Sequence, residues 1–347
     1  MTKFPKVKTL AAVAGACVTL FASTSANAYV YAVSRLQVTN LVIAATNSAG
    51  GALNVASAYQ FNVTDSASFT TGMTTVSQAD TRSCQGNVTT GFTTCSIFGP
   101  EVLGTNVANA PGSSPLRANN DFSFLGTAST QNYSSSDASI ETAELVQGIP
   151  TTTKQISESL VNGSLQAAAT TTLNSNTTLT MLITIANGGT NLRLGFDADM
   201  DQMSKIFDLG ASDFSASTTG NVNLTLTKNQ SGGKKISWAP DGTMLGCVNS
   251  LAPVTCTITA DAENLQAQTG TSVNPSTDQN ATFNTASDFG NFGLNIRGLD
   301  AGTYTLVLAS GTGTLVSRTP EPATLALLGI ALAGLGLTTR RRAGKQA

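Results

Sequence analysis

The chain has 347 residues, of which only 11% are charged, and a formal net charge of −2. It contains no histidine, which excludes the usual Ser-His-Asp and Cys-His nucleophile arrangements. Between the two ends of the chain, the one adjacent basic pair is Lys234-Lys235. A nucleic-acid-binding surface needs clustered basic residues, so nucleic acid is not an expected partner.

Residues 1–28 have the pattern of a secretory signal peptide. A basic start is followed by an apolar run over residues 9–21 and by Ala26-Asn27-Ala28, an A-x-A cleavage site. We expect a signal helix that the Sec translocon receives and that signal peptidase cuts before Tyr29. An uncut signal is the alternative, but a run of 13 residues is short for a membrane span.

The region between the two ends, residues 29–317, is acidic. Eight of the 18 basic residues and one of the 20 acidic residues lie in the signal and the tail, which leaves ten positive against nineteen negative charges. The net charge of this ectodomain is therefore about −9, a balance that suits a soluble extracellular protein.

The four cysteines that remain after signal cleavage fit an oxidising compartment. Their spacing favours two local bridges, Cys84 to Cys95 and Cys247 to Cys256, although four cysteines allow three pairings. Free buried thiols are the alternative. A metal site is disfavoured because the chain has no C-x-x-C spacing and no histidine.

Alternation of apolar and polar residues dominates the ectodomain and predicts half-buried strands. The alternation is clearest over residues 178–185, 221–226, 254–258, 292–296 and 304–308, and weaker strands are expected at 35–44, 53–63 and 86–98. Residues 104–120 and 132–139 are expected to be loops. The fold class is mostly β, an antiparallel, jelly-roll-like β-sandwich. We expect one elaborated sandwich, with two smaller domains as the alternative.

Asp197, Asp199 and Asp201, with Asp208 at the twelfth position, resemble the start of a calcium-binding loop. However, Gln202 stands where such a loop needs glycine, and successive carboxylates on one strand face lie about 6.6 Å apart, too far to converge on one ion. We therefore expect a solvated strand face, with calcium binding as the weaker alternative and no metal or other cofactor.

Two further candidates have structural explanations. Trp238, the only tryptophan, could form a sugar-binding platform, but beside a Pro-Asp-Gly turn it is more often a core anchor. Glu141 and Glu144 could imitate a glycosidase pair, but such carboxylates flank a cleft and come from separate elements. We expect no catalytic residues.

The tail, residues 318–347, is a membrane-sorting pattern. Pro320, Glu321 and Pro322 precede an apolar run, and Arg340, Arg341 and Arg342 follow it. Residues 322–339 would form a helix of about 27 Å, close to the ~30 Å hydrocarbon core. The arginines would stay cytoplasmic and serve as a stop-transfer signal, so the ectodomain lies across the membrane. A buried core helix is the alternative, but this run lacks a polar face.

A Pro-Glu-Pro box, an apolar span and an arginine cluster, in a chain with a signal peptide, resemble the PEP-CTERM sorting signal of Gram-negative, exopolysaccharide-producing bacteria. The resemblance implies processing by an exosortase, a membrane-embedded, cysteine transpeptidase-like protease. Within the ectodomain, residues 64–67, 196–199, 237–242 and 299–306 are similar to an EDSAP-like group of PEP-CTERM proteins. Members of that group often carry a Glu-Asp-Ser-Ala box, in which Thr64 here replaces the leading glutamate. That group implies no catalytic residues.

We therefore expect a non-enzymatic exported protein that is an exosortase substrate. It would be anchored for a time in the inner membrane by its single C-terminal transmembrane helix, with its N-terminus outside. It would then reach the cell surface or the exopolysaccharide matrix, with exopolysaccharide as a further partner. A carbohydrate-binding or adhesive surface module is the alternative function, and a secreted hydrolase with paired acids is the third.

Overall fold

The structure is a computed structural model that describes residues 29–87, 91–95, 102–129, 131–141, 152–162, 169–207, 212–230, 232–273, 279–283 and 289–320. Among these residues, no helix has the length and apolar character needed to cross a membrane. The expected signal at 1–28 and the expected span at 322–339 lie outside the described residues.

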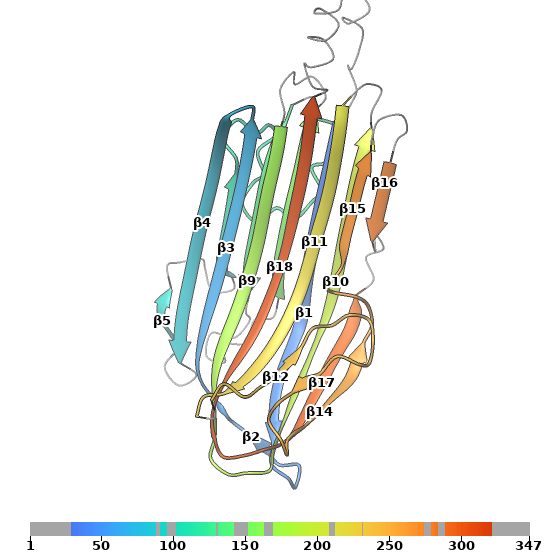
Figure 1. The fold of residues 1–347 in the computed structure, drawn as a ribbon. Helices are drawn as coiled ribbons and strands as arrows, with labels where there is room; N and C mark the ends of the chain where they lie inside the picture. Colours follow the sequence, from blue (N-terminus) through green and yellow to red (C-terminus); the bar gives the residue numbers. More distant parts are fainter. Residues whose placement is uncertain are drawn as a thin grey trace, which may run out of the picture.

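The described chain folds into two antiparallel sheets, which we call sheet A and sheet B (Figure 1). Sheet A has the order β14-β17-β10-β1-β8-β7-β6, with β16 beside β10 and β2 beside β1. Its strands are β1 (Tyr29–Thr46), β2 (Ala52–Leu53), β6 (Val102–Asn109), β7 (Tyr133–Glu141), β8 (Thr152–Asn162), β10 (Thr190–Phe207), β14 (Thr255–Asp261), β16 (Gln279–Phe283) and β17 (Gly290–Leu299).

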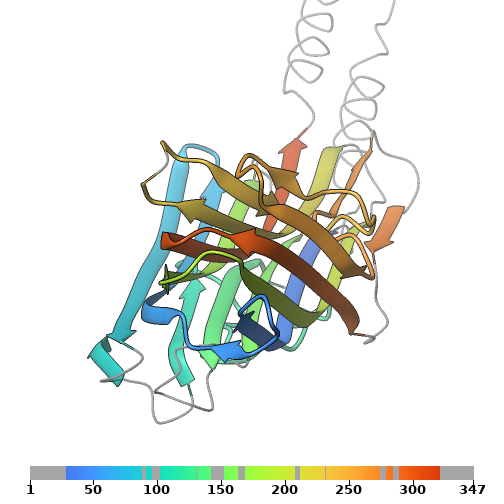
Figure 2. The same ribbon diagram turned by 90° about the horizontal axis from the view of Figure 1, so that it is seen from below.

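Sheet B has the order β13-β12-β11-β18-β9-β3-β4-β5, with β15 beside β11. Its strands are β3 (Ala56–Thr71), β4 (Thr74–Asn87), β5 (Gly91–Cys95), β9 (Ala169–Ile185), β11 (Ser212–Lys228), β12 (Lys235–Trp238), β13 (Val248–Asn249), β15 (Gln268–Val273) and β18 (Gly302–Pro320). The two sheets pack face to face, which confirms the expected mostly-β sandwich (Figures 1 and 2).

The two ends of the described chain lie at the same end of the sandwich. Tyr29 pairs with Phe207 at the end of β10, and Pro320 pairs with Ser212 at the start of the next strand. We call this the proximal end, at the top of Figure 1, and the opposite end, near Thr46 and Gly302, the distal end. Strand β18, which leads to the tail, is an interior strand that pairs along 17 residues with both β9 and β11.

The interior differs along the length of the strands. The distal half holds a large apolar core, which includes Phe61, Met181, Phe196, Leu224, Trp238, Leu294 and Leu306. A smaller apolar cluster with Val30, Val161, Ile206, Phe214 and Val316 lies at the proximal end. Each fully buried side chain of this kind contributes about 1.5–3 kcal/mol, so both ends have an ordinary hydrophobic driving force.

Between these two clusters, buried polar side chains fill the space between the sheets. This polar layer consists of Ser34, Asp65, Gln155, Ser157, Ser159, Ser175, Thr177, Ser310, Thr312 and Thr314. Several of its hydrogen bonds join the two sheets directly. Gln155 donates to the Ser310 hydroxyl at 2.8 Å, and the hydroxyls of Ser157 and Thr312 are 3.1 Å apart.

Two expected loops are wrong in part. Residues 133–139, expected in a loop, belong to β7, in which eight of nine residues are buried. The serines of β7 have no apolar alternation, but Ser134 and Ser136 donate across the sandwich to backbone carbonyls of Ser68 and Ser66. Residues 104–109, expected at the start of another loop, belong to β6, which pairs with β7.

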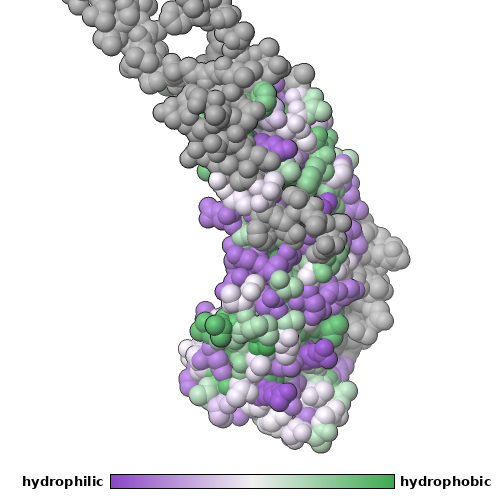
Figure 3. All heavy atoms as spheres, turned by 90° about the vertical axis from the view of Figure 1, so that its right-hand side faces the viewer, coloured by the Kyte–Doolittle hydropathy of each residue, from purple (hydrophilic) through white to green (hydrophobic). Residues whose placement is uncertain are grey.

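The segment between β6 and β7 crosses the outer face of sheet A. There Phe122 and Leu125 pack with Tyr31 and Tyr133 in a separate apolar cluster. Elsewhere the surface is mixed, and Figure 3 shows hydrophobic residues dispersed among hydrophilic ones on one side of the molecule. This segment covers the proximal part of the outer face of sheet A, and the distal part of that face stays open to solvent.

Candidate functional site

Strand β10 places the three predicted aspartates on the outer face of sheet A, but not in one environment. Asp197 is half-buried, whereas Asp199 and Asp201 are 4% and 2% exposed. The expected solvated strand face is therefore wrong for Asp199 and Asp201. Among the described residues, no three His, Cys, Asp or Glu side chains are grouped to hold a metal ion.

Asp201 is covered because a neighbouring cation and a loop lie over it. Arg35 on β1 donates to Asp201 through Nε at 2.9 Å and also through Nη2. The guanidinium carbon of Arg35 lies 4.8 Å from the centre of the Phe124 ring, which belongs to the segment between β6 and β7. Burial raises the pKa of the Asp201 carboxyl, although the hydrogen bond from Arg35 opposes that shift.

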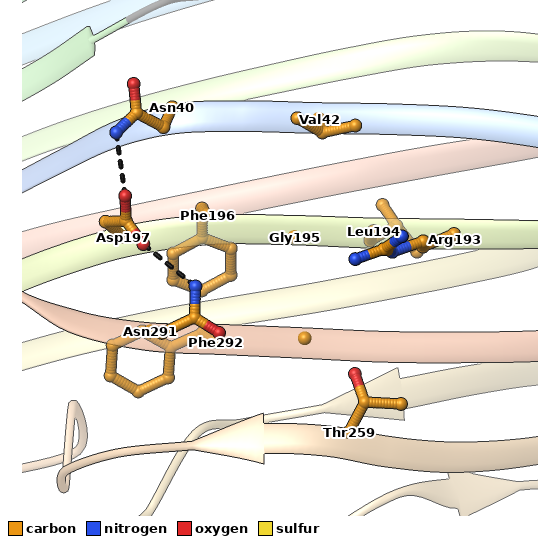
Figure 4. Close-up of a pocket in the computed structure, with 11 residues that line it drawn as sticks. Asn40, Val42, Arg193, Leu194, Gly195, Phe196, Asp197, Thr259, Asn291 and Phe292 are labelled. Atoms are coloured by element: carbon orange, nitrogen blue, oxygen red, sulfur yellow. Dashed lines mark hydrogen bonds between the residues drawn. The ribbon is translucent and has the colours of Figure 1, made fainter.

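Asp197 lies in a surface groove with a volume of about 330 Å³. The groove runs over β1, β10, β17 and β14, and Figure 4 shows the residues that line it. They are Asn40, Val42, Arg193, Leu194, Gly195, Phe196, Asp197, Thr259, Asn291, Phe292 and Gly293. The groove therefore combines one carboxylate, two amides and one guanidinium with a stretch of glycine backbone.

Two asparagines hold the Asp197 carboxylate from opposite sides (Figure 4). The Asn40 side chain donates to Oδ2 at 2.7 Å, and the Asn291 side chain donates to Oδ1 at 3.0 Å. Asn40 has a φ of 54° and lies in a bulge of β1, where the pairing with β10 shifts between Thr39 and Val42. The bulge re-aims the Asn40 side chain toward Asp197, as β-bulges beside functional sites often do.

Two paired glycines lie in the middle of the groove, where Gly195 is partly exposed and Gly293 is buried beside Thr259. Gly195 of β10 pairs with Gly293 of β17. A Cβ atom at Gly293 would lie 2.4 Å from the Thr259 hydroxyl oxygen, so this position requires glycine unless Thr259 moves. A Cβ atom at Gly195 would lie 3.6 Å from the nearest atom, the Phe292 carbonyl oxygen, and would fit at ordinary contact distance.

A second cluster of charged and polar residues is structural. Glu158 on β8 forms a fully buried ion pair with Arg117 and accepts the Tyr31 hydroxyl at 2.7 Å. It also accepts the backbone N–H groups of Leu125 and Gly126, at 2.9 and 2.8 Å. Burial raises the pKa of Tyr31. This cluster fastens the segment between β6 and β7 to sheet A.

Disulfide-bonded cysteines lie at two places in the distal half. Cys247 and Cys256 form a disulfide with their Cα atoms 6.3 Å apart, as the sequence predicted. Cys84 is disulfide-bonded and lies directly opposite Cys95 in the pairing of β4 with β5. The pairing of Cys84 with Cys95 stays a prediction, which this register favours.

The other candidate residues have ordinary surroundings. Trp238 is 1% exposed and packs against Phe196 with ring centres 5.9 Å apart, so it is a core anchor and not a sugar platform. Glu141 is 3.3 Å from the Lys154 ammonium group. Its expected companion Glu144 lies outside the described residues, as does Asp208.

The sorting tail begins inside the last strand. Arg318 of β18 is 8% exposed, and its guanidinium carbon lies 5.7 Å from the centre of the Phe214 ring. Pro320 is the last residue of β18. The remaining predicted residues of the two ends lie outside the described residues: Ala26, Ala28, Glu321, Pro322, Arg340, Arg341 and Arg342.

The residues of the groove were missed by sequence reasoning, apart from Asp197. Asn40 lies within a bulge, and Gly195 and Gly293 are almost one hundred residues apart but adjacent in the sheet. The alternation on each strand predicts which residues face outward. It does not predict which outward residues of different strands lie side by side.

Comparison with known proteins identifies the tail. A family described as PEP-CTERM protein-sorting motif matches residues 318–342. No curated protein matches the chain. Among solved structures, the structure of infectious bursal disease virus Gx strain is 10% identical. The match covers 91% of this chain and 74% of that chain, with a TM-score of 0.09. The chain thus carries, over residues 318–342, the PEP-CTERM protein-sorting motif, which marks it as an exported protein sorted by an exosortase.

Proposed function

We propose that this chain is a cell-surface or exopolysaccharide-matrix protein that an exosortase processes at its tail, and that it has no catalytic activity of its own. The observation that carries the proposal is the match of the sorting motif to residues 318–342, directly after the sandwich. The lack of histidine supports the non-catalytic part, because the common nucleophilic triads need one.

The way in which the motif joins the fold supports sorting at a membrane. The motif starts at Arg318, while β18 continues to Pro320, so its first three residues belong to an interior strand. No free linker therefore separates the sandwich from the Pro-Glu-Pro box. Proline restricts its own backbone and that of the preceding residue, so the sequence of the box disfavours a helix and favours an extended segment, the form that a protease would bind.

The fold also gives the molecule a direction. Tyr29, the first residue after the expected signal cleavage, and Pro320 both lie at the proximal end. A chain held by its tail would keep the proximal end at the membrane and point the distal end outward. The groove around Asp197 would then lie about 36 Å from the proximal end, since Asn40 is eleven residues along β1 from Tyr29.

The proposal is tested by separating the parts of the tail. Alanine at Pro320, Glu321 and Pro322 should leave the protein exported and membrane-bound with its tail attached. Alanine at Arg340, Arg341 and Arg342 should weaken orientation, because each charge at mid-membrane costs about 3 kcal/mol, so some protein escapes unprocessed. Mass analysis of the C-terminus in membrane and extracellular fractions separates the two results.

The control for lost positive charge is alanine at Lys234 and Lys235, which are exposed near the distal end. This variant should be processed like the wild type. If the box variant still loses its tail at the wild-type rate, the tail is an ordinary anchor and the sorting proposal is wrong. Fractionation of cells with and without an exosortase tests the partner directly.

A further inference from the structure

We propose that the groove around Asp197 binds a neutral saccharide through neighbouring hydroxyl groups. This activity goes beyond sorting and does not depend on the tail. It is a specific form of the carbohydrate-binding alternative, and it rests on the geometry of the groove.

The polar end of the groove presents alternating donors and acceptors. Each oxygen of the Asp197 carboxylate accepts one amide N–H, from Asn40 or Asn291, and keeps a further lone pair. Each amide keeps a second N–H and a carbonyl oxygen. A sugar hydroxyl both donates and accepts, so two neighbouring hydroxyls can donate to Asp197 while they accept from the two amides.

The middle of the groove suits the flat, less polar face of a sugar ring. Gly195 is partly exposed there and has no side chain, Gly293 is buried beside Thr259, and Val42, which is 51% exposed, forms one wall. Arg193 lies at the far end, four residues along β10 from Asp197, a distance of about 13 Å. The groove is therefore elongated, with hydrogen-bonding groups at both ends and the glycine backbone and Val42 between them.

Other ligand classes fit less well. An extended peptide binds by adding a strand to a free sheet edge, but Gly195 already pairs with Val42 on one side and Gly293 on the other. A metal ion would find one carboxylate among the lining residues. An anion would meet that carboxylate, a single arginine and an acidic ectodomain.

The residues of the groove are fixed by the sheet. They are on paired strands, and Asn40 keeps the unfavourable φ of 54° that brings its amide to Asp197. Such a conformation costs about 1–3 kcal/mol, and it persists only where the surroundings determine it. A preformed site avoids the ordering cost of binding, which matters for weak polar ligands.

The test is a binding titration of the purified full chain with neutral glucose, mannose and galactose oligomers, with polygalacturonate as an acidic probe. We expect saturable binding of at least one neutral oligomer. Asp197→Asn should weaken binding about tenfold or more, because the site loses its charged acceptor. Gly195→Ala should weaken it about tenfold, because the added methyl group meets ligand and not protein.

Gly270→Ala is the matched control. Gly270 is a strand glycine on β15 of the other sheet, and an added Cβ atom there also has its nearest neighbour at 3.6 Å. This variant should bind like the wild type, and all three variants should keep the wild-type unfolding midpoint. A lack of saturable binding to every neutral oligomer overturns the proposal. So does binding that Asp197→Asn and Gly195→Ala leave unchanged, or binding of polygalacturonate alone.

Failure of this proposal is distinguishable from failure of the sorting proposal. The Pro320, Glu321 and Pro322 variant should bind the oligomers like the wild type, while Gly195→Ala should be exported and processed like the wild type. A loss of both properties in either variant would indicate misfolding, which the unfolding midpoint detects.

Discussion

The distal core and the polar layer are built on the same strands but by different forces. On β18, the inward residues Tyr304, Leu306 and Leu308 belong to the apolar core, and the next two, Ser310 and Thr312, belong to the polar layer. A buried apolar side chain contributes about 1.5–3 kcal/mol, whereas a hydrogen bond contributes about 0.5–1.5 kcal/mol net. Backbone pairing therefore continues across both regions, although their side chains stabilise the fold unequally.

The largest expected effect is in the distal core. Phe196 is 2% exposed and stacks on Phe292 with ring centres 5.1 Å apart. Phe196→Ala should lower the free energy of unfolding by about 3–5 kcal/mol, because it removes buried surface and leaves a cavity. Urea unfolding followed by the fluorescence of Trp238, the single tryptophan, measures this change.

Arg193→Ala is the control on the same strand, since Arg193 is exposed on the outer face. It should change the free energy of unfolding by less than about 0.5 kcal/mol. If Phe196→Ala costs no more than this control, the distal core is not the main source of stability.

The same contrast explains what the sequence could predict. The clearest predicted strands, such as 178–185 and 304–308, are those whose inward residues enter the distal core. Their alternation disappears in the polar layer, because Ser175 and Thr177 point inward while Asn174 and Asn176 point outward. In β7, serines on both faces are buried, so no apolar period remained to distinguish that strand from a loop.

The candidate site was predictable only in part. The sequence indicated Asp197 and its outward direction, because both follow from alternation on one strand. It did not indicate that Asn40 and Asn291 bracket Asp197, since that depends on the pairing of β1, β10 and β17 and on a bulge. Burial of Asp201 depends on Arg35 and Phe124, which come from elsewhere in the chain.

A smaller loss of stability is expected for a substitution in the polar layer, at Ser310 of β18. The Ser310 hydroxyl lies 2.8 Å from both the Gln155 amide and the Thr177 hydroxyl. Ser310→Ala should lower the free energy of unfolding by about 1–2 kcal/mol, since Gln155 and Thr177 keep their hydrogen bond to each other. Leu308→Ala, at the preceding inward position, should cost about 2–5 kcal/mol in the same titration. Equal costs would contradict the proposed difference between the two regions.

At acidic pH, the smallest change in the free energy of unfolding is expected for Asp65→Asn in the polar layer. Asp65 is fully buried, and desolvation raises the pKa of its carboxyl well above the ordinary value, a shift to which the charge of Asp137 adds. Near pH 4 and below, the folded wild type therefore holds a neutral acid, which the amide replaces with little change in shape. The variant and the wild type should then differ by less than about 0.5 kcal/mol in free energy of unfolding.

The difference should grow with pH, and its sign follows from proton binding. Above the unfolded-state pKa of about 3.9, the unfolded chain releases the Asp65 proton while the folded protein keeps it, so the stability of the wild type falls as pH rises. Asp65→Asn removes this loss and should become the more stable protein toward neutral pH. Burial raises the pKa of Asp137 to about 7, so Asp137 also lowers the stability of the wild type as pH rises, but only up to about pH 7. Asp137→Asn is therefore the control that separates the contribution of Asp137 from that of Asp65. Unfolding titrations at several pH values measure the difference in free energy of unfolding between Asp65→Asn and the wild type. If this difference stays constant with pH, or favours the wild type as pH rises, Asp65 is ionised inside the polar layer and the expectation is wrong.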